Sequence, residues 1–401
     1  MWMDEAVLYQ IYPLGFCGAP AENDGILSHR LEKIREWIPH LKWLGVDGVY
    51  FSPLFESDRH GYDTRDFFRV DTRLGTNDDL KALCRALHES GIRVILDGVF
   101  NHVGRGCPQF QDVIRNREAS PYRDWFHIDF GGNTCYGDGF WYESWEGHYE
   151  LVRLNLQNPA VRDHLFAAVR FWVEEFGIDG LRLDVAYSLD RAFLEALRTF
   201  CDRLKKPDFP LIGEVLFGDY NLLVNDRMLH SCTNYENYKS LYSAVNSDNL
   251  WELSYSLNRQ FGPEPWCIYR GKHLLTFADN HDVTRIASIL RDPARLPLVW
   301  ALLMTEPGVP TVYYGSEWGI EGRKEDGDSA LRPCPDAPVR NALTEQIREL
   351  IRMRKSDPIW SYGGYRNLSQ GNKAFTFARE LDGRQAKVTV DLDSCSWKVE
   401  Q

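Results

Sequence analysis

Short apolar segments alternate with longer amphipathic segments through most of the chain. The apolar segments are rich in β-branched and aromatic residues, as strands are, and lie at residues 7–12, 48–51, 93–96, 180–183, 209–213, 228–233, 274–277 and 309–313. Between them, apolar side chains recur every three or four positions, which is the spacing of an amphipathic helix. The pattern predicts eight strands and about eight helices over residues 1–355.

Local signals support this division into strand–helix units. The first helical pattern should end at Gly45, because glycine adopts the left-handed conformation that closes a helix. Another helix should begin after Asn158, since Pro159 suits the first helical turn. Residues 93–96 do not alternate with polar positions, which indicates a strand buried on both faces of a parallel sheet. Eight such units predict an α/β fold, the TIM (β/α)8 barrel.

Two segments interrupt the repeating pattern. Residues 103–155, after the third strand, are too long for an ordinary connection and rich in aromatic side chains, which favours a folded lid over a disordered loop. Beyond residue 355, two alternating segments flank Asp382 and Gly383 and predict an antiparallel hairpin. We therefore expect a barrel of residues 1–102 and 156–355, an inserted domain of residues 103–155, and a short C-terminal antiparallel β-domain of residues 356–401.

Composition narrows the function classes. The chain has 46 basic and 58 acidic residues, a net charge of −12, which disfavours nucleic acid and anionic membrane surfaces as partners. Aromatic residues make up 13% of the chain, a high value. They either fill the core or include platforms on which flat ligands such as sugar rings stack.

Several features indicate a cytoplasmic protein. The first residues show no basic region or cleavage site of a signal peptide. The most apolar stretch, residues 296–315, contains Glu306, Pro307 and Pro310, so it should not cross a bilayer as one helix. Nine scattered cysteines without a CxxC pair fit reduced thiols, with a bridge between Cys107 and Cys135 as the less favoured alternative.

Acidic residues follow four of the predicted strands. Asp97, Asp184, Glu214 and Asp282 come at or just after the ends of the third, fourth, fifth and seventh strands. Working groups of this fold lie at the carboxyl ends of the strands, so these carboxylates should share one rim. Arg182, two positions before Asp184, should point to the same side.

Such a set of carboxylates suits the hydrolysis of glycosidic bonds. That reaction uses one ionised carboxylate as nucleophile and one protonated carboxyl group as acid. Arg182 would keep a neighbouring carboxylate ionised. His102 and His281 could donate hydrogen bonds to sugar hydroxyls, or could be structural histidines behind the site.

Four ordered motifs resemble the signature regions of the α-amylase family of glycoside hydrolases. They are Asp-Gly-Val-Phe-Asn-His at 97–102, Gly-Leu-Arg-Leu-Asp-Val-Ala at 180–186, Gly-Glu at 213–214 and Phe-Ala-Asp-Asn-His-Asp at 277–282. Residues 9–13, 60–63 and 308–315 resemble further family stretches. The resemblance covers residues 6–355, nearly the whole predicted barrel.

The resemblance implies a role for each site residue. It assigns Asp184 as nucleophile, Glu214 as general acid/base and Asp282 as the third carboxylate that orients the sugar. Tyr62 would stack on the sugar ring in subsite −1. The resemblance implies that subsite −1 is lined by Asp63, His102, Arg182 and His281 and supported by Asp97 and Asn101. In the insertion, Trp141 and Trp145 are candidates for stacking on more distant sugars, or else for packing on the barrel.

The function implied is that of a retaining glycoside hydrolase. Its substrates would be α-glucans with mainly α-1,4 bonds, such as maltooligosaccharides or cyclodextrins, and its chemistry would need no cofactor. An α-1,6-acting glucosidase and a 4-α-glucanotransferase are alternatives on the same scaffold, because subsite shape decides between them. A catalytically inactive binding or transport-partner homologue is disfavoured, since all three carboxylates are present.

Within the family, the chain resembles the neopullulanase, cyclomaltodextrinase and maltogenic amylase branch. Residues 151–155, Leu-Val-Arg-Leu-Asn, are similar to a string of that branch. Tyr187 and Ser188 differ from the residues that relatives place at subsites +1 and +2. Because the first strand begins near Val7, we expect the branch's N-terminal β-domain to be missing, which leaves monomer and homodimer open. No Asp-rich loop has typical calcium spacing, so the sequence does not decide whether calcium binds.

Overall fold

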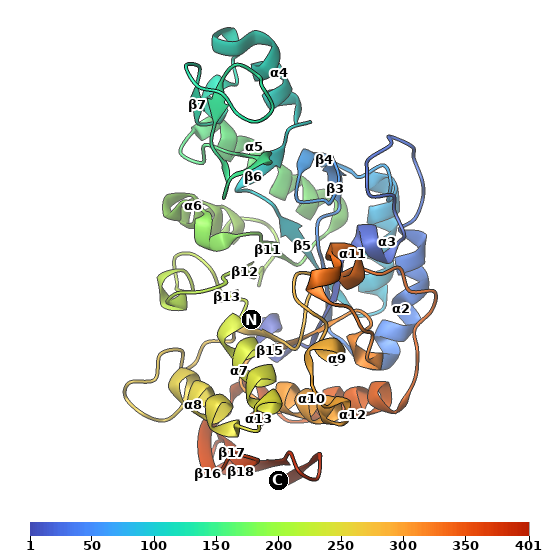
Figure 1. Ribbon diagram of the computed structural model, residues 1–401, viewed down its shortest axis with the longest axis vertical. Coiled ribbons are helices and arrows are strands. Elements are labelled where there is room, and N and C mark those ends of the chain that lie inside the picture. Colours follow the sequence, from blue (N-terminus) through green and yellow to red (C-terminus); the bar gives the residue numbers. More distant parts are fainter. Residues whose placement is uncertain (401) are drawn as a thin grey trace.

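A computed structural model describes residues 1–400 and shows a closed barrel of eight parallel strands (Figure 1). The strands are β1 Leu8–Ile11, β2 Gly48–Phe51, β5 Arg93–Gly98, β11 Gly180–Leu183, β12 Leu211–Gly213, β13 Ser231–Cys232, β14 Leu275–Phe277 and β15 Val309–Tyr313. Each pairs in parallel with its neighbours, and a parallel bridge from Thr233 to Leu275 joins the last two edges. The predicted TIM barrel is confirmed, and each strand lies where the sequence pattern puts it.

Eight longer helices accompany the strands. They are α2 Glu32–Leu44, α3 Asn77–Glu89, α5 Pro159–Phe171, α6 Arg191–Asp202, α7 Tyr235–Asn246, α8 Leu250–Phe261, α10 Leu296–Thr305 and α12 Ala342–Ser356. Gly45 closes α2 in a left-handed conformation with φ of 93°, as its position predicts. The Asn158 side chain accepts a hydrogen bond from the Ala160 amide and begins α5.

One crossover departs from the regular repeat. Only the short η6, Tyr220–Leu222, lies between β12 and β13, whereas α7 and α8 both follow β13. Gly218, Asp219 and Asn225 occupy this connection, and such residues favour turns over helix. The remaining short helical elements are η1 Trp2–Glu5, α1 Pro13–Phe16, η4 Trp172–Phe176, η5 Ala186–Ser188, α9 Ile286–Ile289, η7 Pro293–Arg295, η8 Ser316–Trp318, η9 Lys324–Asp326, α11 Asp328–Leu331 and α13 Ile359–Tyr362.

The barrel interior changes from apolar to polar along the strands. Leu8, Tyr50, Ile95, Ile212 and Val309 belong to an apolar cluster of the interior. Because side chains two positions apart share a face, the next inward positions are Gln10 after Leu8, Asp97 after Ile95, and Glu214 after Ile212. Apolar packing thus fills one end of the barrel, and polar groups gather at the carboxyl ends of the strands.

The segment after β5 folds as a small unit above this end of the barrel (Figure 1). Its elements are β6 His102–Gly104, α4 Pro108–Asn116, η2 Arg117–Ala119, η3 Arg123–Trp125, β7 Ile128–Asp129, β8 Trp141–Tyr142, β9 Ser144–Trp145 and β10 His148–Arg153. Phe110 is fully buried within it and meets Phe126 and Tyr142 edge to face at centroid distances of 5.2 and 4.9 Å. Aromatic packing therefore gives this insertion a core, and it is an ordered fold.

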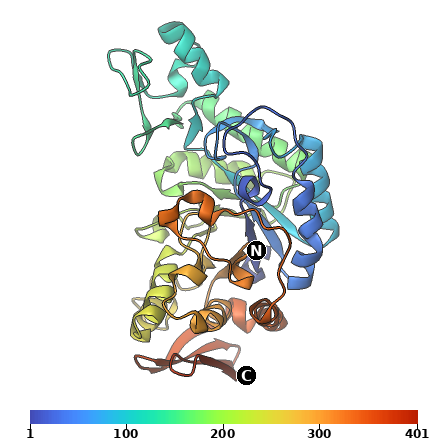
Figure 2. The same ribbon diagram turned by 45° about the vertical axis from the view of Figure 1, so that its right-hand side comes forward.

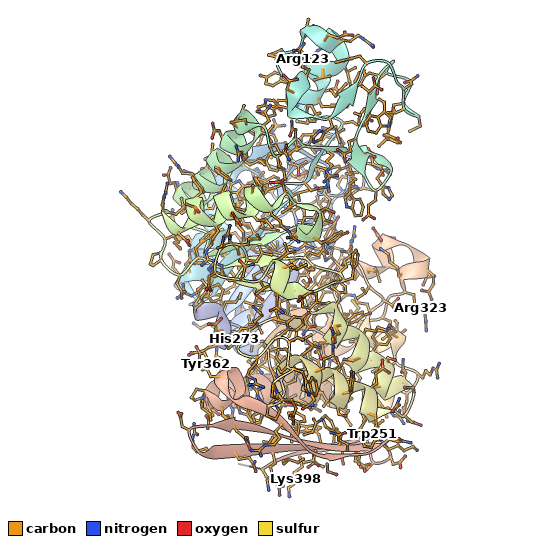
Figure 3. All side chains as sticks on the ribbon, turned by 90° about the vertical axis from the view of Figure 1, so that its left-hand side faces the viewer. Arg123, Trp251, His273, Arg323, Tyr362 and Lys398 are labelled. Carbon is orange, nitrogen blue, oxygen red and sulfur yellow. The ribbon has the colours of Figure 1, made fainter. Side chains whose placement is uncertain are left out.

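A four-stranded antiparallel sheet packs at the opposite end of the molecule, as Figures 2 and 3 show. Its strands are β16 Gly364–Gln370, β17 Ala374–Leu381, β18 Arg384–Asp391 and β19 Ser396–Glu400. Asp382 and Gly383, with φ of 51° and 77°, form the predicted hairpin turn between β17 and β18. The buried guanidinium of Arg379 donates to the carbonyl oxygen of Thr305 at 2.9 Å, which ties the sheet to the end of α10.

Two expectations about the chain as a whole can be compared with the structure. All nine cysteines are free thiols; Cys107 is buried and Cys135 is exposed, so the alternative of a bridge between them is wrong. Within residues 1–400, no helix combines the length and the apolar character that a membrane crossing demands.

Candidate active site

Arg182 organises the carboxylates at the carboxyl ends of the strands. From β11 its guanidinium donates to both carboxylate oxygens of Asp97, at 2.9 and 2.8 Å, and to Asp184 Oδ1 at 2.9 Å. Its other terminal nitrogen lies 2.7 Å from Glu214 Oε1. All four side chains are at least nine-tenths buried. One cation therefore holds three carboxylates in a site with little solvent screening.

The backbone after Asp184 contributes to the same arrangement. Val185 adopts a left-handed conformation with φ of 38°, which is rare for a β-branched residue and strained. In this conformation its amide donates to Glu214 Oε2 at 3.0 Å. The strained turn therefore links the residue that follows Asp184 to the carboxylate of Glu214.

Burial shifts the ionisation of these acids. Burial raises the pKa of Asp97, Asp184 and Glu214 to about 7 each, although Arg182 acts in the opposite direction on all three. One guanidinium does not compensate three buried negative charges. Near neutral pH the cluster therefore keeps a proton, and an ionised and a protonated carboxyl group can coexist there.

Asp282 stays ionised by contrast. Burial would raise its pKa, but His281 and Arg332 more than offset this and hold the pKa well below its usual range. Its oxygens lie 3.0 Å from His281 Nε2 and 2.9 Å from Arg332 Nη2. His281 Nδ1 is 2.7 Å from the Gln10 amide nitrogen, so a residue of β1 orients the ring.

Tyr62 and His102 complete the wall around Asp184. The Tyr62 ring stacks on His281 with ring centroids 5.6 Å apart, and its hydroxyl contacts His281 Nε2 and lies 3.4 Å from Asp97. His102 Nε2 lies 3.9 Å from Asp184 Oδ2. Burial lowers the pKa of His102 to about 3, so the ring is neutral. Among residues 1–400 its Nε2 has no hydrogen-bond partner, a buried polar atom that a ligand hydroxyl could satisfy.

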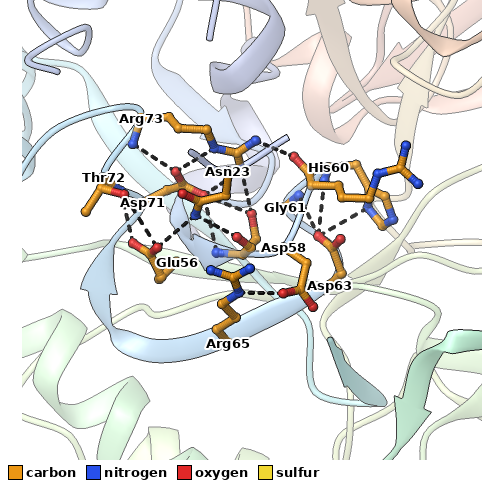
Figure 4. Close-up of polar contacts among 12 residues, drawn as sticks. Asn23, Glu56, Asp58, His60, Gly61, Asp63, Arg65, Asp71, Thr72 and Arg73 are labelled. Carbon is orange, nitrogen blue, oxygen red and sulfur yellow. Dashed lines mark hydrogen bonds and ion pairs between the residues drawn. The ribbon is translucent and has the colours of Figure 1, made fainter. Parts of the chain in front are cut away.

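A polar network holds the loop that carries Tyr62 (Figure 4). Asp63 accepts hydrogen bonds from the amides of His60 and Gly61, both at 3.1 Å, and turns its carboxylate toward the loop. The fully buried Arg73 donates to Asp71 at 2.7 Å and to the Arg59 carbonyl oxygen at 2.7 Å. This loop follows β3 Phe55–Ser57 and leads into β4 Thr64–Val70.

These groups meet at a cavity of about 450 Å³ at the mouth of the barrel. Of the predicted site residues, those that line it are Asp184, Glu214, Asp282, Tyr62, His102 and Trp145. Those that are not among its lining residues are Asp63, Arg182, His281, Asp97 and Asn101.

Three predicted lining residues bind groups next to the cavity. Asp63 accepts from the loop amides, Arg182 binds Asp184, and His281 binds Asp282. Trp141 is not among the lining residues either, and its indole nitrogen donates to the Tyr149 hydroxyl at 3.1 Å.

The structure adds lining residues that we did not predict from the sequence. They are His60, His148, Glu150, Tyr235, Leu216, Lys324, Asp328 and Arg332. Arg332 comes from the segment after β15, fifty positions from the Asp282 that it binds. The four-residue spacing of Asp328 and Arg332, which places them on one face of a helical turn, is the one sequence signal for this pair.

The fold and the site define a (β/α)8 barrel protein with a carboxylate-centred cavity of the kind that acts on sugars. Residues 10–358 match the family model described as the alpha amylase catalytic domain, and the chain belongs to that family.

Known relatives come from the branch that the sequence motifs indicated. The chain is 32% identical to a maltogenic α-amylase of Bacillus acidopullulyticus over 90% of this chain, and it spans 64% of that protein's length. It is 30% identical to a cyclomaltodextrinase of a Bacillus species, over 98% of this chain and 73% of that protein. Among solved structures, a cyclic α-maltosyl-(1→6)-maltose hydrolase from Arthrobacter globiformis aligns with a TM-score of 0.86 and 28% identity, covering 97% of this chain and 91% of that one.

Proposed function

We propose that the chain is a retaining glycoside hydrolase that cleaves α-glucosidic bonds, mainly α-1,4, in maltooligosaccharides, cyclodextrins or related α-glucans. The observation that carries this proposal is the placement of Asp184 and Glu214 on the two terminal nitrogens of one buried guanidinium at the cavity. Retention requires carboxyl groups about 5–5.5 Å apart, and a shared guanidinium supports so short a separation.

The three carboxylates have different roles in this mechanism. Asp184, ionised, attacks the anomeric carbon, while Glu214 donates its proton to the leaving oxygen. Glu214 then takes a proton from water, which attacks the anomeric carbon and releases Asp184. Asp282, held ionised by His281 and Arg332, stabilises the positive charge that develops on the sugar.

Further parts of the proposal follow from the same site. Tyr62 would stack on the ring at subsite −1, and Trp145 would contact the sugar on the side of the insertion. Catalysis belongs to the barrel of residues 1–102 and 156–355, residues 103–155 cover it as an inserted domain, and residues 356–401 form the C-terminal unit. We assign no cofactor to the chemistry. Nine free thiols support a reducing compartment, which is consistent with the cytoplasm.

The experiment is product analysis with maltotriose, β-cyclodextrin, pullulan and starch for the wild type and Asp184→Asn. We expect α-anomeric products from the wild type by NMR and a loss of at least about 10³-fold in kcat for the variant, since it lacks the nucleophile. A β-anomeric first product, or a fully active Asp184→Asn, would disprove the assignment. Release of maltotriose from pullulan would favour α-1,6 action, whereas trisaccharides that keep the α-1,6 bond would show α-1,4 action. Longer oligosaccharide products would favour glucan transfer.

A further inference from the structure

We propose that Tyr187 and Glu146 form a strap across the leaving-group side of the cavity and restrict cleavage of linear glucans to bonds with a short leaving group. The inference rests on the proposed function and deepens it. It concerns η5, residues 186–188, which follows Asp184 in the chain.

The leaving-group side of the cavity follows from the chemistry. The acid that protonates the leaving oxygen must face it, so the leaving sugar lies beside Glu214. The Ala186 amide donates to the Glu214 carbonyl oxygen at 3.0 Å, so Tyr187 lies next to a residue bound to Glu214. Tyr187 and Leu216, which directly neighbour these two segments, both line the cavity. Lys324, Asp328 and Arg332 line the side of Asp282, where Arg332 binds that carboxylate.

The strap joins two walls of this cavity. The Tyr187 hydroxyl donates to Glu146 Oε1 at 3.4 Å. Glu146 lies at the tip of the hairpin between β9 and β10, whose neighbouring residues Trp145 and His148 line the cavity too. A glucan chain that extends past Tyr187 therefore has to pass between the barrel and the inserted domain at the point where these side chains meet.

Neighbouring contacts hold both ends of the strap. The Tyr187 ring packs against Phe217 with ring centroids 5.3 Å apart. Arg153 of β10 donates to the Ser188 carbonyl oxygen at 3.3 Å and to Glu143 at 2.5 Å, which is a second link between the insertion and this segment. The hydrogen bond of Tyr187 is long and therefore weak, so the packed ring supplies most of the obstruction.

The hairpin tip allows a substitution that removes Glu146 without harming the fold. Glu146 and Gly147 have φ of 48° and 87°, the combination of a two-residue turn that favours Asn-Gly. Glu146→Asn should therefore keep the turn and shorten the side chain beyond reach of Tyr187. Tyr187→Phe removes only the hydroxyl, and Tyr187→Ala removes the ring.

The test is the cleavage pattern of maltoheptaose labelled at its reducing end. We expect the wild type to release labelled glucose or maltose. Tyr187→Ala should release labelled fragments of three or more sugars about tenfold more often, with smaller increases for Glu146→Asn and Tyr187→Phe. The matched control is Tyr149→Phe, which removes a hydroxyl of the same hairpin that bonds Trp141 outside the cavity.

With an active wild type, two results would overturn the strap alone. One is an unchanged pattern in Tyr187→Ala and Glu146→Asn while the wild type remains active, and the other is a wild type that already releases long labelled fragments. A wild type inactive on every α-glucan of the panel overturns the proposed function and the strap with it. If circular dichroism shows that Tyr187→Ala is unfolded, Glu146→Asn and Tyr187→Phe provide the test of the strap.

Discussion

Replacing Glu214 by Gln should abolish catalysis and stabilise the fold, and the stabilisation should grow with pH. Three carboxylates share the one guanidinium of Arg182, so burial of the ionised Glu214 is poorly compensated. Its pKa is raised to about 7, from an ordinary value of 4.5. Because the folded pKa lies above the unfolded one, the wild type loses stability as pH rises from 4.5 to 7. The neutral glutamine avoids that loss.

The magnitude follows from the size of the shift. One pKa unit corresponds to 1.36 kcal/mol, so Glu214→Gln should gain about 3 kcal/mol above about pH 8. Near pH 5, Glu214 is still protonated in the folded protein, and the pH is close to its pKa in the unfolded chain. The gain in unfolding free energy from Glu214→Gln should therefore stay below about 1 kcal/mol there. For a chain of 401 residues, about 3 kcal/mol corresponds to a rise of about 4 °C in Tm.

The assay is urea unfolding of both proteins near pH 5 and pH 8, followed by tryptophan fluorescence and far-ultraviolet circular dichroism. The matched control is Glu321→Gln, a substitution at an exposed position, which should shift neither transition. This prediction is refuted if Glu214→Gln is no more stable than the wild type near pH 8. It is refuted as well if the gain is the same at both pH values.

Two further substitutions should destabilise the protein. Asp282→Asn should lower both activity and stability at neutral pH. The pKa of Asp282 is lowered because the ionised carboxylate makes favourable contacts with His281 and Arg332. These contacts stabilise the fold above the ordinary pKa of an aspartic acid and are lost on acidification. In the same urea series, equal stability of this variant and the wild type at neutral pH would contradict a stabilising role for these contacts of Asp282. Arg379→Ala should lower the unfolding free energy by about 3 kcal/mol, since it leaves the buried carbonyl oxygens of Thr305 and Gly363 without their donor. Its kcat should not change, and a fall in kcat without a fall in stability would show a different role.

Much of the barrel was predictable because its determinants are local. A strand buried on both faces appears as a short apolar run, and a covering helix appears as a repeat of three or four positions. The direction of a side chain on a strand has a period of two, so residue parity placed Arg182 on the same side as Asp184. The missing helix between β12 and β13 was harder to predict, because turn-forming residues weaken the pattern without excluding a helix.

The site residues also divide into those that the local sequence predicts and those that only the fold positions. The sequence by itself determined the eight strands, the ordered carboxylates at their ends and the family to which they point, since each depends on residues close together in the chain. Only the tertiary structure decided that Arg332 binds Asp282, that Arg73 binds the Arg59 carbonyl oxygen, and that Tyr187 meets Glu146. These contacts join loops that are distant in the sequence, and loop side chains have no fixed period. Closure of the barrel and packing of the insertion set the positions of these loop side chains.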